Sequence, residues 1–182
     1  KQREFFNEEI LFKSDGISNY RIPSLITTND GTVLAFCNDR KNTLDDHAVN
    51  TNLVYARKEL NGKWTKPTTL LEREGVLYLI GSAVHDKETN TSFIFVNQKF
   101  AKDEFQKLTE EETKELEKQN QIKAKEMGLE LGNVQLVSTD NGKTWKSEKV
   151  IEEPLVFTHI NGKTITAVSF PHGCSHGVQL KH

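Results

Sequence analysis

The stretch from Ser138 to Trp145, which reads Ser-Thr-Asp-Asn-Gly-Lys-Thr-Trp, decides the fold. It follows directly on the alternating run that starts at Val134. In a turn of this kind the Asp side chain can accept hydrogen bonds from backbone N–H groups, Gly makes the bend, and Trp packs beneath the hairpin. The stretch therefore predicts a structural turn, and it indicates the fold more directly than the function.

Turns of related composition recur along the chain. Asn-Gly or Asn-Asp-Gly stands at 29–31, 61–62, 141–142 and 161–162, each beside short apolar or alternating runs. Such dipeptides between alternating runs are a strong signal for a tight hairpin. The sequence therefore predicts stacked antiparallel meanders. The expected strands cover residues 22–28, 32–37, 52–57, 63–65, 77–80, 82–85, 91–96, 134–138 and 163–168.

One segment, residues 102–127, breaks this pattern. It is dense in charge and contains neither Gly nor Pro, and Thr109 with Glu112 fits a capping box at a helix start. Its apolar residues are sparse, so the predicted helix lies on the surface. Two interpretations stay open, which are a solvated helical insertion between strands and a lid or partner-docking segment.

Length and composition limit the class of protein. The chain has 182 residues, with 24 Lys and Arg against 26 Asp and Glu, and a formal net charge of −2. This balance excludes a strongly basic nucleic-acid binder, and no apolar run approaches the roughly 18 residues that a membrane helix needs. Cys37 and Cys174 are too few for a disulfide framework or a zinc site. No cofactor and no metal is expected.

Four motifs carry a resemblance to the sialidase (neuraminidase) superfamily. Residues 138–145 resemble its Asp-box, or BNR repeat, and residues 57–64 look like a degenerate copy that keeps the Gly and the Trp. Residues 20–25 resemble its Phe/Tyr-Arg-Ile-Pro motif, and residues 31–36 resemble its Gly-Thr-Leu-Leu-Ala-Phe strand. Near the C-terminus, residues 175–180 resemble its Gly-His-Gly-Ile-Gln-Leu stretch. These ordered matches span essentially the whole chain.

The resemblance implies an all-β, six-bladed β-propeller. At roughly 40 to 50 residues per blade, the chain outside the helical insertion suffices for about the first three blades. Residues 1–182 are then expected to be the N-terminal portion of a sialidase-like catalytic domain, with the insertion at 102–127 included. The implied partners are sialylated glycans on glycoproteins and glycolipids, together with the C-terminal remainder of the same propeller. The family acts on extracellular glycans, so the resemblance implies a secreted or cell-surface location.

The implied activity is that of an exo-sialidase, a glycoside hydrolase that removes terminal sialic acids with retention. Arg21 resembles the family arginine that binds the carboxylate of sialic acid, a role that suits the planar, permanently charged guanidinium. Arg40 resembles a second arginine of the pocket, with a structural ion pair to Asp39 or Asp45 as the alternative. By resemblance Asp46 is the general acid/base, and Asp45 competes for that role or contacts the substrate. The family's Tyr nucleophile and its Glu base are expected C-terminal to this chain.

Other functions fit the same motifs. A trans-sialidase, intramolecular or not, shares every motif quoted. A non-catalytic propeller lectin would keep the arginines and bind sialylated glycans without cleaving them. In a third interpretation the Asp-box indicates only that the chain is a propeller, and that propeller binds other proteins.

Overall fold

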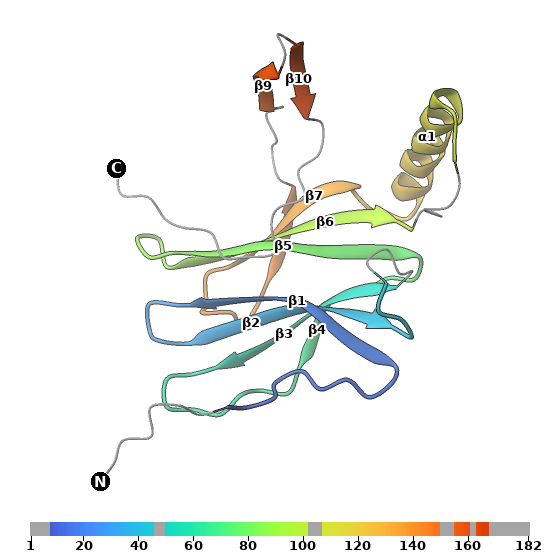
Figure 1. The fold of residues 1–182 in the computed structure, drawn as a ribbon. Coiled ribbons are helices and arrows are strands. Elements are labelled where there is room, and N and C mark those ends of the chain that lie inside the picture. The colour runs from blue at the N-terminus through green and yellow to red at the C-terminus, as the bar shows by residue number, and fades with distance from the viewer. Residues whose placement is uncertain (1–7, 46–49, 102–106, 150–154, 161–162, 168–182) are drawn as a thin grey trace.

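The computed structural model describes residues 8–45, 50–101, 107–149, 155–160 and 163–167, and these ranges form ten strands and one helix (Figure 1). In chain order the elements are β1 (Ser18–Thr27), β2 (Val33–Lys41), β3 (Thr51–Lys58), β4 (Thr68–Leu71), β5 (Val76–Asp86), β6 (Thr91–Phe100), α1 (Glu110–Glu126), β7 (Gly132–Ser138), β8 (Lys146–Lys149), β9 (Leu155–Ile160) and β10 (Lys163–Ala167).

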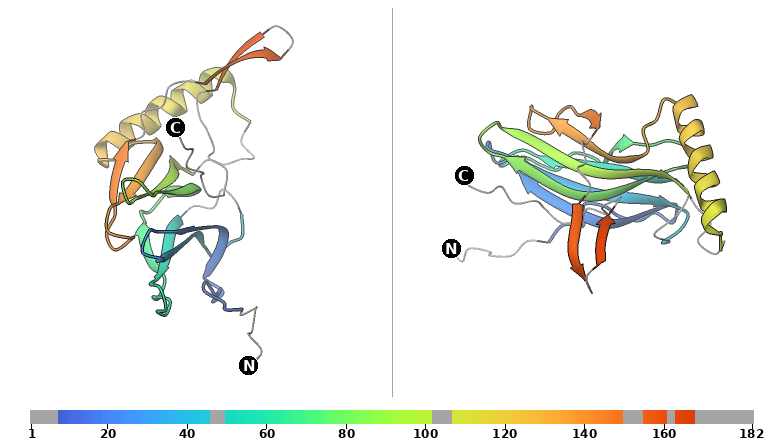
Figure 2. Two further views of the ribbon diagram at one scale, coloured as in Figure 1. Left: turned by 90° about the vertical axis from the view of Figure 1, so that its left-hand side faces the viewer. Right: turned by 90° about the horizontal axis from the view of Figure 1, so that it is seen from above.

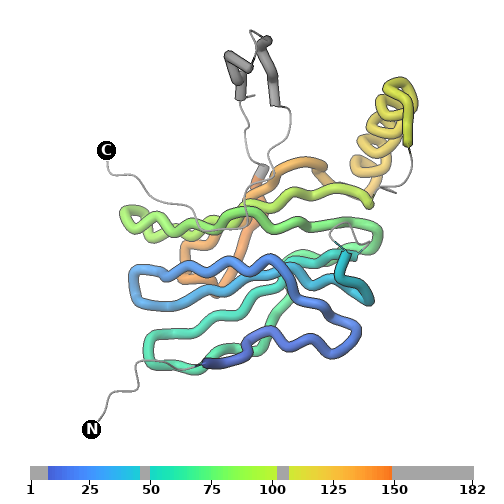
Figure 3. The backbone as a smooth tube through the Cα atoms, viewed as in Figure 1, coloured from blue at the N-terminus to red at the C-terminus, as the bar shows by residue number. Residues whose placement is uncertain are grey.

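The strands β1 to β4 and β5 to β8 form two antiparallel meanders, as Figure 3 shows along the backbone. Each strand pairs with the next one in the chain within its meander. A parallel contact between Thr51 of β3 and Leu77 of β5 joins the two meanders into one sheet system. The sequence prediction of antiparallel meanders built from hairpins is therefore confirmed for β1 to β8.

The two meanders pack against each other through one apolar core. β1 also lies beside β5, so the first strands of the two meanders are neighbours. Burial of a Leu, Ile or Phe side chain of this kind stabilises the fold by about 1.5–3 kcal/mol. The buried residues of this core are Ile26, Leu34, Phe36, Leu53, Tyr55, Val76, Tyr78, Ile80, Ala83, Ile94, Val96, Phe100, Ala124, Val134 and Leu136.

Three expected strands differ from the structure. Residues 63–65 make only an isolated bridge between Trp64 and Lys58, and β4 begins at Thr68. Pro67 lies between them, and its missing N–H cannot join the ladder. The runs 77–80 and 82–85 belong to a single strand, β5, whose register shifts between Ile80 and Ala83.

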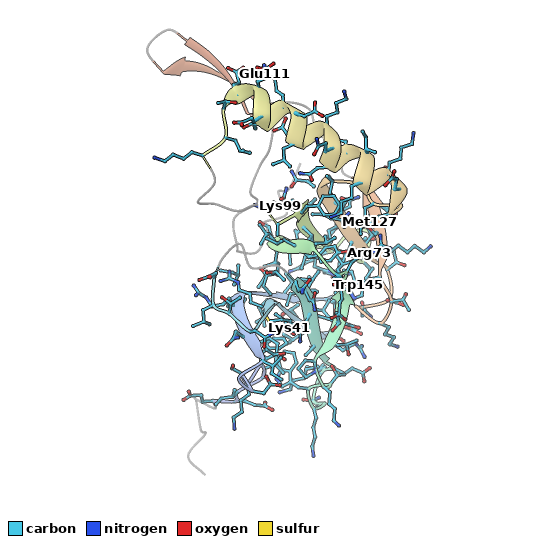
Figure 4. All side chains as sticks on the ribbon, turned by 90° about the vertical axis from the view of Figure 1, so that its right-hand side faces the viewer. Lys41, Arg73, Lys99, Glu111, Met127 and Trp145 are labelled. Atoms are coloured by element: carbon cyan, nitrogen blue, oxygen red, sulfur yellow. The ribbon has the colours of Figure 1, made fainter. Side chains whose placement is uncertain are left out.

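The helix α1 is shorter than the predicted insertion. It begins at Glu110 because the capping box forms, with Glu112 N donating to Thr109 Oγ1 over 3.2 Å and Thr109 N donating to Glu112 Oε2 over 2.8 Å. Residues 107–109 precede the helix, and residues 102–106 lie outside the described ranges. Ala124 is its buried residue. Figures 2 and 4 show the helix projecting from the meanders, with Met127 near them and Glu111 at the far end.

The strands β9 and β10 pair antiparallel with each other. Among the described residues the strands form no closed ring, so the mostly β architecture is confirmed, whereas the number of blades stays a prediction. No described helix has the length and apolar character that a membrane crossing requires. Cys37 is a buried free thiol, and burial raises its pKa. Cys174 lies outside the described ranges.

Candidate functional site

The connections of the two meanders lie at two opposite ends of the strands (Figure 1). We call one of them the turn end, which comprises residues 28–32, 59–63, 87–90 and 139–145. Here the turns bond to one another, because Asn141 Nδ2 donates to Asp30 Oδ2 over 2.7 Å and Asn29 Nδ2 donates to Lys87 O over 2.8 Å. The insertion end comprises the start of β1, residues 42–45 and 72–75, and α1.

The predicted Asp-box forms the largest part of the turn end. Asp140 Oδ1 accepts hydrogen bonds from Ser138 Oγ (2.8 Å), Lys143 N (3.0 Å) and Thr144 N (2.9 Å). Asp140 Oδ2 accepts one from Thr144 Oγ1 over 2.6 Å. Burial alone would raise the pKa of Asp140, but these bonds, led by those from Thr144, lower it to about 2. The carboxylate is thus engaged in holding its own turn.

The rest of the Asp-box anchors the turn to the core. Gly142 has a φ of 78°, and a Cβ there would lie 2.4 Å from a methyl carbon of Leu34. The Trp145 ring meets Phe36 and Tyr55 edge-on at centroid distances of 5.5 and 6.2 Å. The structure therefore confirms the prediction that Trp145 packs beneath the hairpin.

At the insertion end, two predicted site residues share one face of the first meander. Arg21 lies opposite Asn38, and Asn19 lies opposite Arg40. Residues opposite each other in an antiparallel pair point to the same face, so Arg21, Asn38 and Arg40 are on one side of the sheet. Phe36 points to that side as well and packs in the core between the meanders. The side chain of Arg21 is exposed.

Arg40 is buried, with 2% of its surface exposed. Its Nη1 donates to the carbonyl oxygen of Leu44 over 2.7 Å, which ties β2 to the loop that follows it. Asp39 points to the opposite face and lies 2.6 Å from Lys41 Nζ through its Oδ2. The ion pair of Asp39 is therefore with Lys41.

The two candidate acids, Asp45 and Asp46, follow Leu44 in the sequence. Asp45 is exposed, and its backbone N donates to Thr43 Oγ1 over 3.1 Å. Asp46 lies outside the described residues. The structure thus brings Arg21 and Arg40 to one face and places Asp45 in the loop that starts beside them.

Asn38 is a residue of this face that the sequence analysis did not select. It is 1% exposed, and its Nδ2 donates to the carbonyl oxygen of Tyr78 in the second meander over 2.6 Å. Ile80 N donates back to Asn38 Oδ1 over 3.4 Å. A signal was available, because the face of β2 that carries Phe36 reads Leu34, Phe36, Asn38 and Arg40, and thus changes from apolar to polar toward the insertion end.

A polar hollow of about 220 Å³ also lies at the insertion end. Asn52 Nδ2 donates there to Glu72 Oε1 over 2.9 Å, so part of its polar lining is already bonded internally. Neither Arg21 nor Arg40 lines this hollow, which separates it from the arginine face. Its lining residues are Lys41, Asn50, Asn52, Glu72, Arg73 and Glu74. Within the described ranges, no group of three or more His, Cys, Asp or Glu side chains is arranged to hold a metal ion.

Comparisons with known proteins give a likeness in structure. No model of a known protein family matches the chain, and no curated protein sequence is significantly similar to it. A Hadza microbial sialidase superposes with a TM-score of 0.50 at 19% identity, over 70% of this chain and 25% of that one. A leech intramolecular trans-sialidase gives 0.46 at 21% identity, over 54% and 18%. A protein of unknown function from Dyadobacter fermentans gives 0.49 at 13%, over 85% and 48%.

The chain therefore spans less than half the length of each of these solved structures. At such identities a superposition reports architecture and says nothing of chemistry. The match with the microbial sialidase shows that this chain is mostly β and folds like part of a sialidase structure.

Proposed function

We propose that this chain is the N-terminal portion of a six-bladed sialidase-type propeller, and that the complete protein is an exo-sialidase. The observation that carries the proposal is the arginine face at the insertion end. An exposed Arg21 and a buried Arg40 lie there on one side of the β1–β2 pair, at the opposite end from the Asp-box. The likeness of the fold to part of a microbial sialidase supports it.

In this proposal Arg21 binds the carboxylate of sialic acid. Its guanidinium is free to present two parallel N–H donors, which match the two oxygens of a carboxylate. Arg40 adds positive electrostatic potential from its buried position on the same face. Its bond to the carbonyl oxygen of Leu44 also holds the chain just before Asp45 and Asp46. The buried position of Arg40 suits this supporting role better than direct contact with an exposed ligand.

Asp46 is the proposed general acid/base. Its carboxyl group donates a proton to the glycosidic oxygen as the bond to the anomeric carbon breaks. A Tyr oxygen from the remainder of the propeller gives its proton to the Glu base and forms a new bond to that carbon, and the Glu returns the proton when the Tyr later leaves. Water then breaks the sialyl–tyrosine bond, and the Asp46 carboxylate takes up the proton of that water. Sialidases are among the glycosidases in which a Tyr acts as nucleophile, so two successive inversions give net retention.

The substrates in this proposal are terminal sialic acids of glycoproteins and glycolipids, and the protein acts outside the cell or at its surface. A trans-sialidase would use the same residues of this chain with a sugar hydroxyl in place of water.

Hydrolysis of a fluorogenic sialoside by the complete protein tests the proposal. We expect Asp46→Ala to lower kcat by roughly 10²- to 10⁴-fold, which is the usual contribution of a general acid. Asp45→Ala is the matched control and should remain close to the unmodified protein. An active Asp46→Ala beside an inactive Asp45→Ala would transfer the role to Asp45. A protein that binds sialylated glycans without any turnover would be a lectin, and the enzyme proposal would be wrong.

A further inference from the structure

Ile22 has a backbone conformation that its residue type disfavours. Its φ is 58°, in the left-handed region. Every other residue with positive φ in the described ranges is Asn or Gly, and these two types tolerate that region. A β-branched residue there is an outlier, and such outliers persist only where the surrounding structure holds them. They are concentrated at functional sites.

The conformation of Ile22 creates a bulge in β1. Arg21 pairs with Asn38 and Ser24 pairs with Phe36, so two residues of β1 face one residue, Cys37, of β2. This one extra residue defines a β-bulge, which bends the strand and changes the direction in which a side chain points.

The bulge decides which side chain of β1 lies opposite Asn38. In a regular strand, counting back from Ser24 opposite Phe36 would place Ile22 opposite Asn38, and Arg21 would point to the other face. That other face is occupied by Ser18, whose Oγ donates to Asp39 Oδ2 over 3.2 Å. The extra residue therefore moves Arg21 from the face of Asp39 to the face of Asn38 and Arg40.

We propose that Ile22 is a positioning residue, and that its left-handed conformation holds Arg21 on the face where a carboxylate ligand binds. The inference rests on the proposed function, because it assumes that Arg21 receives the carboxylate of sialic acid. Ile22 is itself partly buried against the apolar core, and the next residue, Pro23, has a fixed φ. Glycine would adopt the same φ more easily but would have no side chain to anchor the bulge.

A pair of substitutions of similar size separates backbone conformation from packing. Ile22→Asn and Ile22→Thr both replace the apolar side chain with a small polar one. Asn tolerates the left-handed region, whereas the β-branched Thr favours an extended strand. A purely structural role in packing predicts that Thr, which keeps the branched shape of Ile, is the milder change. The positioning role predicts that Asn is the milder change.

The readout is the preference for free N-acetylneuraminic acid over its carboxylate methyl ester, measured by calorimetry on the complete protein. We expect the unmodified protein to prefer the acid by roughly tenfold or more, since a hydrogen-bonded ion pair is lost in the ester. Ile22→Asn should keep most of this preference, and Ile22→Thr should lose it as completely as Arg21→Ala does. Thermal melts confirm that each variant is folded, and Ile22→Ala, which also disfavours the left-handed region, replaces Ile22→Thr if that variant does not fold.

The possible results separate the two proposals. If the unmodified protein shows no preference for the acid, the proposed function is wrong, and this inference falls with it. If the unmodified protein prefers the acid and Arg21→Ala does not, the carboxylate-binding role of Arg21 in the proposed function stands. Retention of the preference by Ile22→Thr, or its complete loss in Ile22→Asn, would then overturn the positioning role alone.

Discussion

The polar groups at the turn end and at the insertion end of the meanders have different kinds of hydrogen-bond partner. At the turn end, Asp140 accepts four hydrogen bonds from residues at most four positions away in the sequence, and the turn is locked by its own side chains. At the insertion end, Arg21 is exposed, and the polar residues beneath it bond to other strands or loops. The first arrangement stabilises a fold, and the second leaves the side chain of Arg21 exposed, as the proposed ligand site requires.

Because of this difference, substitutions at the turn end should lower stability with little effect on ligand binding. Gly142→Ala should have the largest effect. The new methyl group would meet Leu34 at 2.4 Å, and the φ of 78° disfavours any side chain. We expect a loss of about 3 kcal/mol in the free energy of unfolding, measured by urea denaturation.

Gly75→Ala is the matched control for that experiment. Gly75 has a similar φ of 75°, but no atom lies within 4 Å of the added carbon. Its loss should be limited to the backbone term of about 1 kcal/mol. Equal losses in the two variants would show that the contact between Gly142 and Leu34 is not tight.

Asp140→Ala should have the next largest effect, a loss of about 2 kcal/mol, because the donors around the carboxylate lose a charged acceptor. The pH dependence has a defined sign. The folded-state pKa of Asp140 is about 2 and its ordinary value is 3.8, so its contribution is complete above pH 3.8 and is lost as the pH falls toward 2.

Urea midpoints between pH 7 and pH 2 check this sign. The unmodified protein should lose stability in that acid range, and Asp140→Asn should lose less of it. Asp30 has the same direction of shift, to a pKa of about 2 through bonds from the Thr28 hydroxyl and the Thr32 N–H, so Asp30→Asn is the companion variant. A steeper acid dependence in Asp140→Asn would contradict the assignment.

Arg21→Ala should have the smallest effect on stability. The side chain is exposed, so the free energy of unfolding should change by less than about 0.5 kcal/mol. Binding of sialic acid should nevertheless fall by roughly ten- to a hundredfold, which corresponds to one charge-assisted pair. Arg21→Lys should recover part of the affinity, because it keeps the charge but not the fork. A large loss of stability in Arg21→Ala would show that Arg21 is structural.

The sequence predicts the turn end well because its information is local. The Asp-box residues are consecutive, and the side-chain bonds of Asp140 reach at most four positions along the chain, so the turn could be inferred from the motif. The capping box of α1 is local in the same way, and it forms as predicted. The start of the helix differed only because the charge-dense segment is longer than the part that Thr109 caps.

The insertion end was predictable only in part. The motif selected Arg21 and Arg40, and the pairing of β1 with β2 places both on one face. The bulge at Ile22 and the bridge from Asn38 to Tyr78 depend on strand register and on a partner 40 positions away. No pattern within a short window contains that information. The same holds for β5, where a register shift joins two runs that looked separate.

The most direct test of the account is an NMR titration of the complete, isotope-labelled protein with free N-acetylneuraminic acid. We expect the backbone amide signals of residues 19–22 and 38–45 to shift with a single dissociation constant, and those of residues 28–32 and 139–145 to stay in place. Shifts confined to the turn end, or no shifts at residues 19–22 at a saturating concentration of the acid, would contradict the proposal that the arginine face is the ligand site.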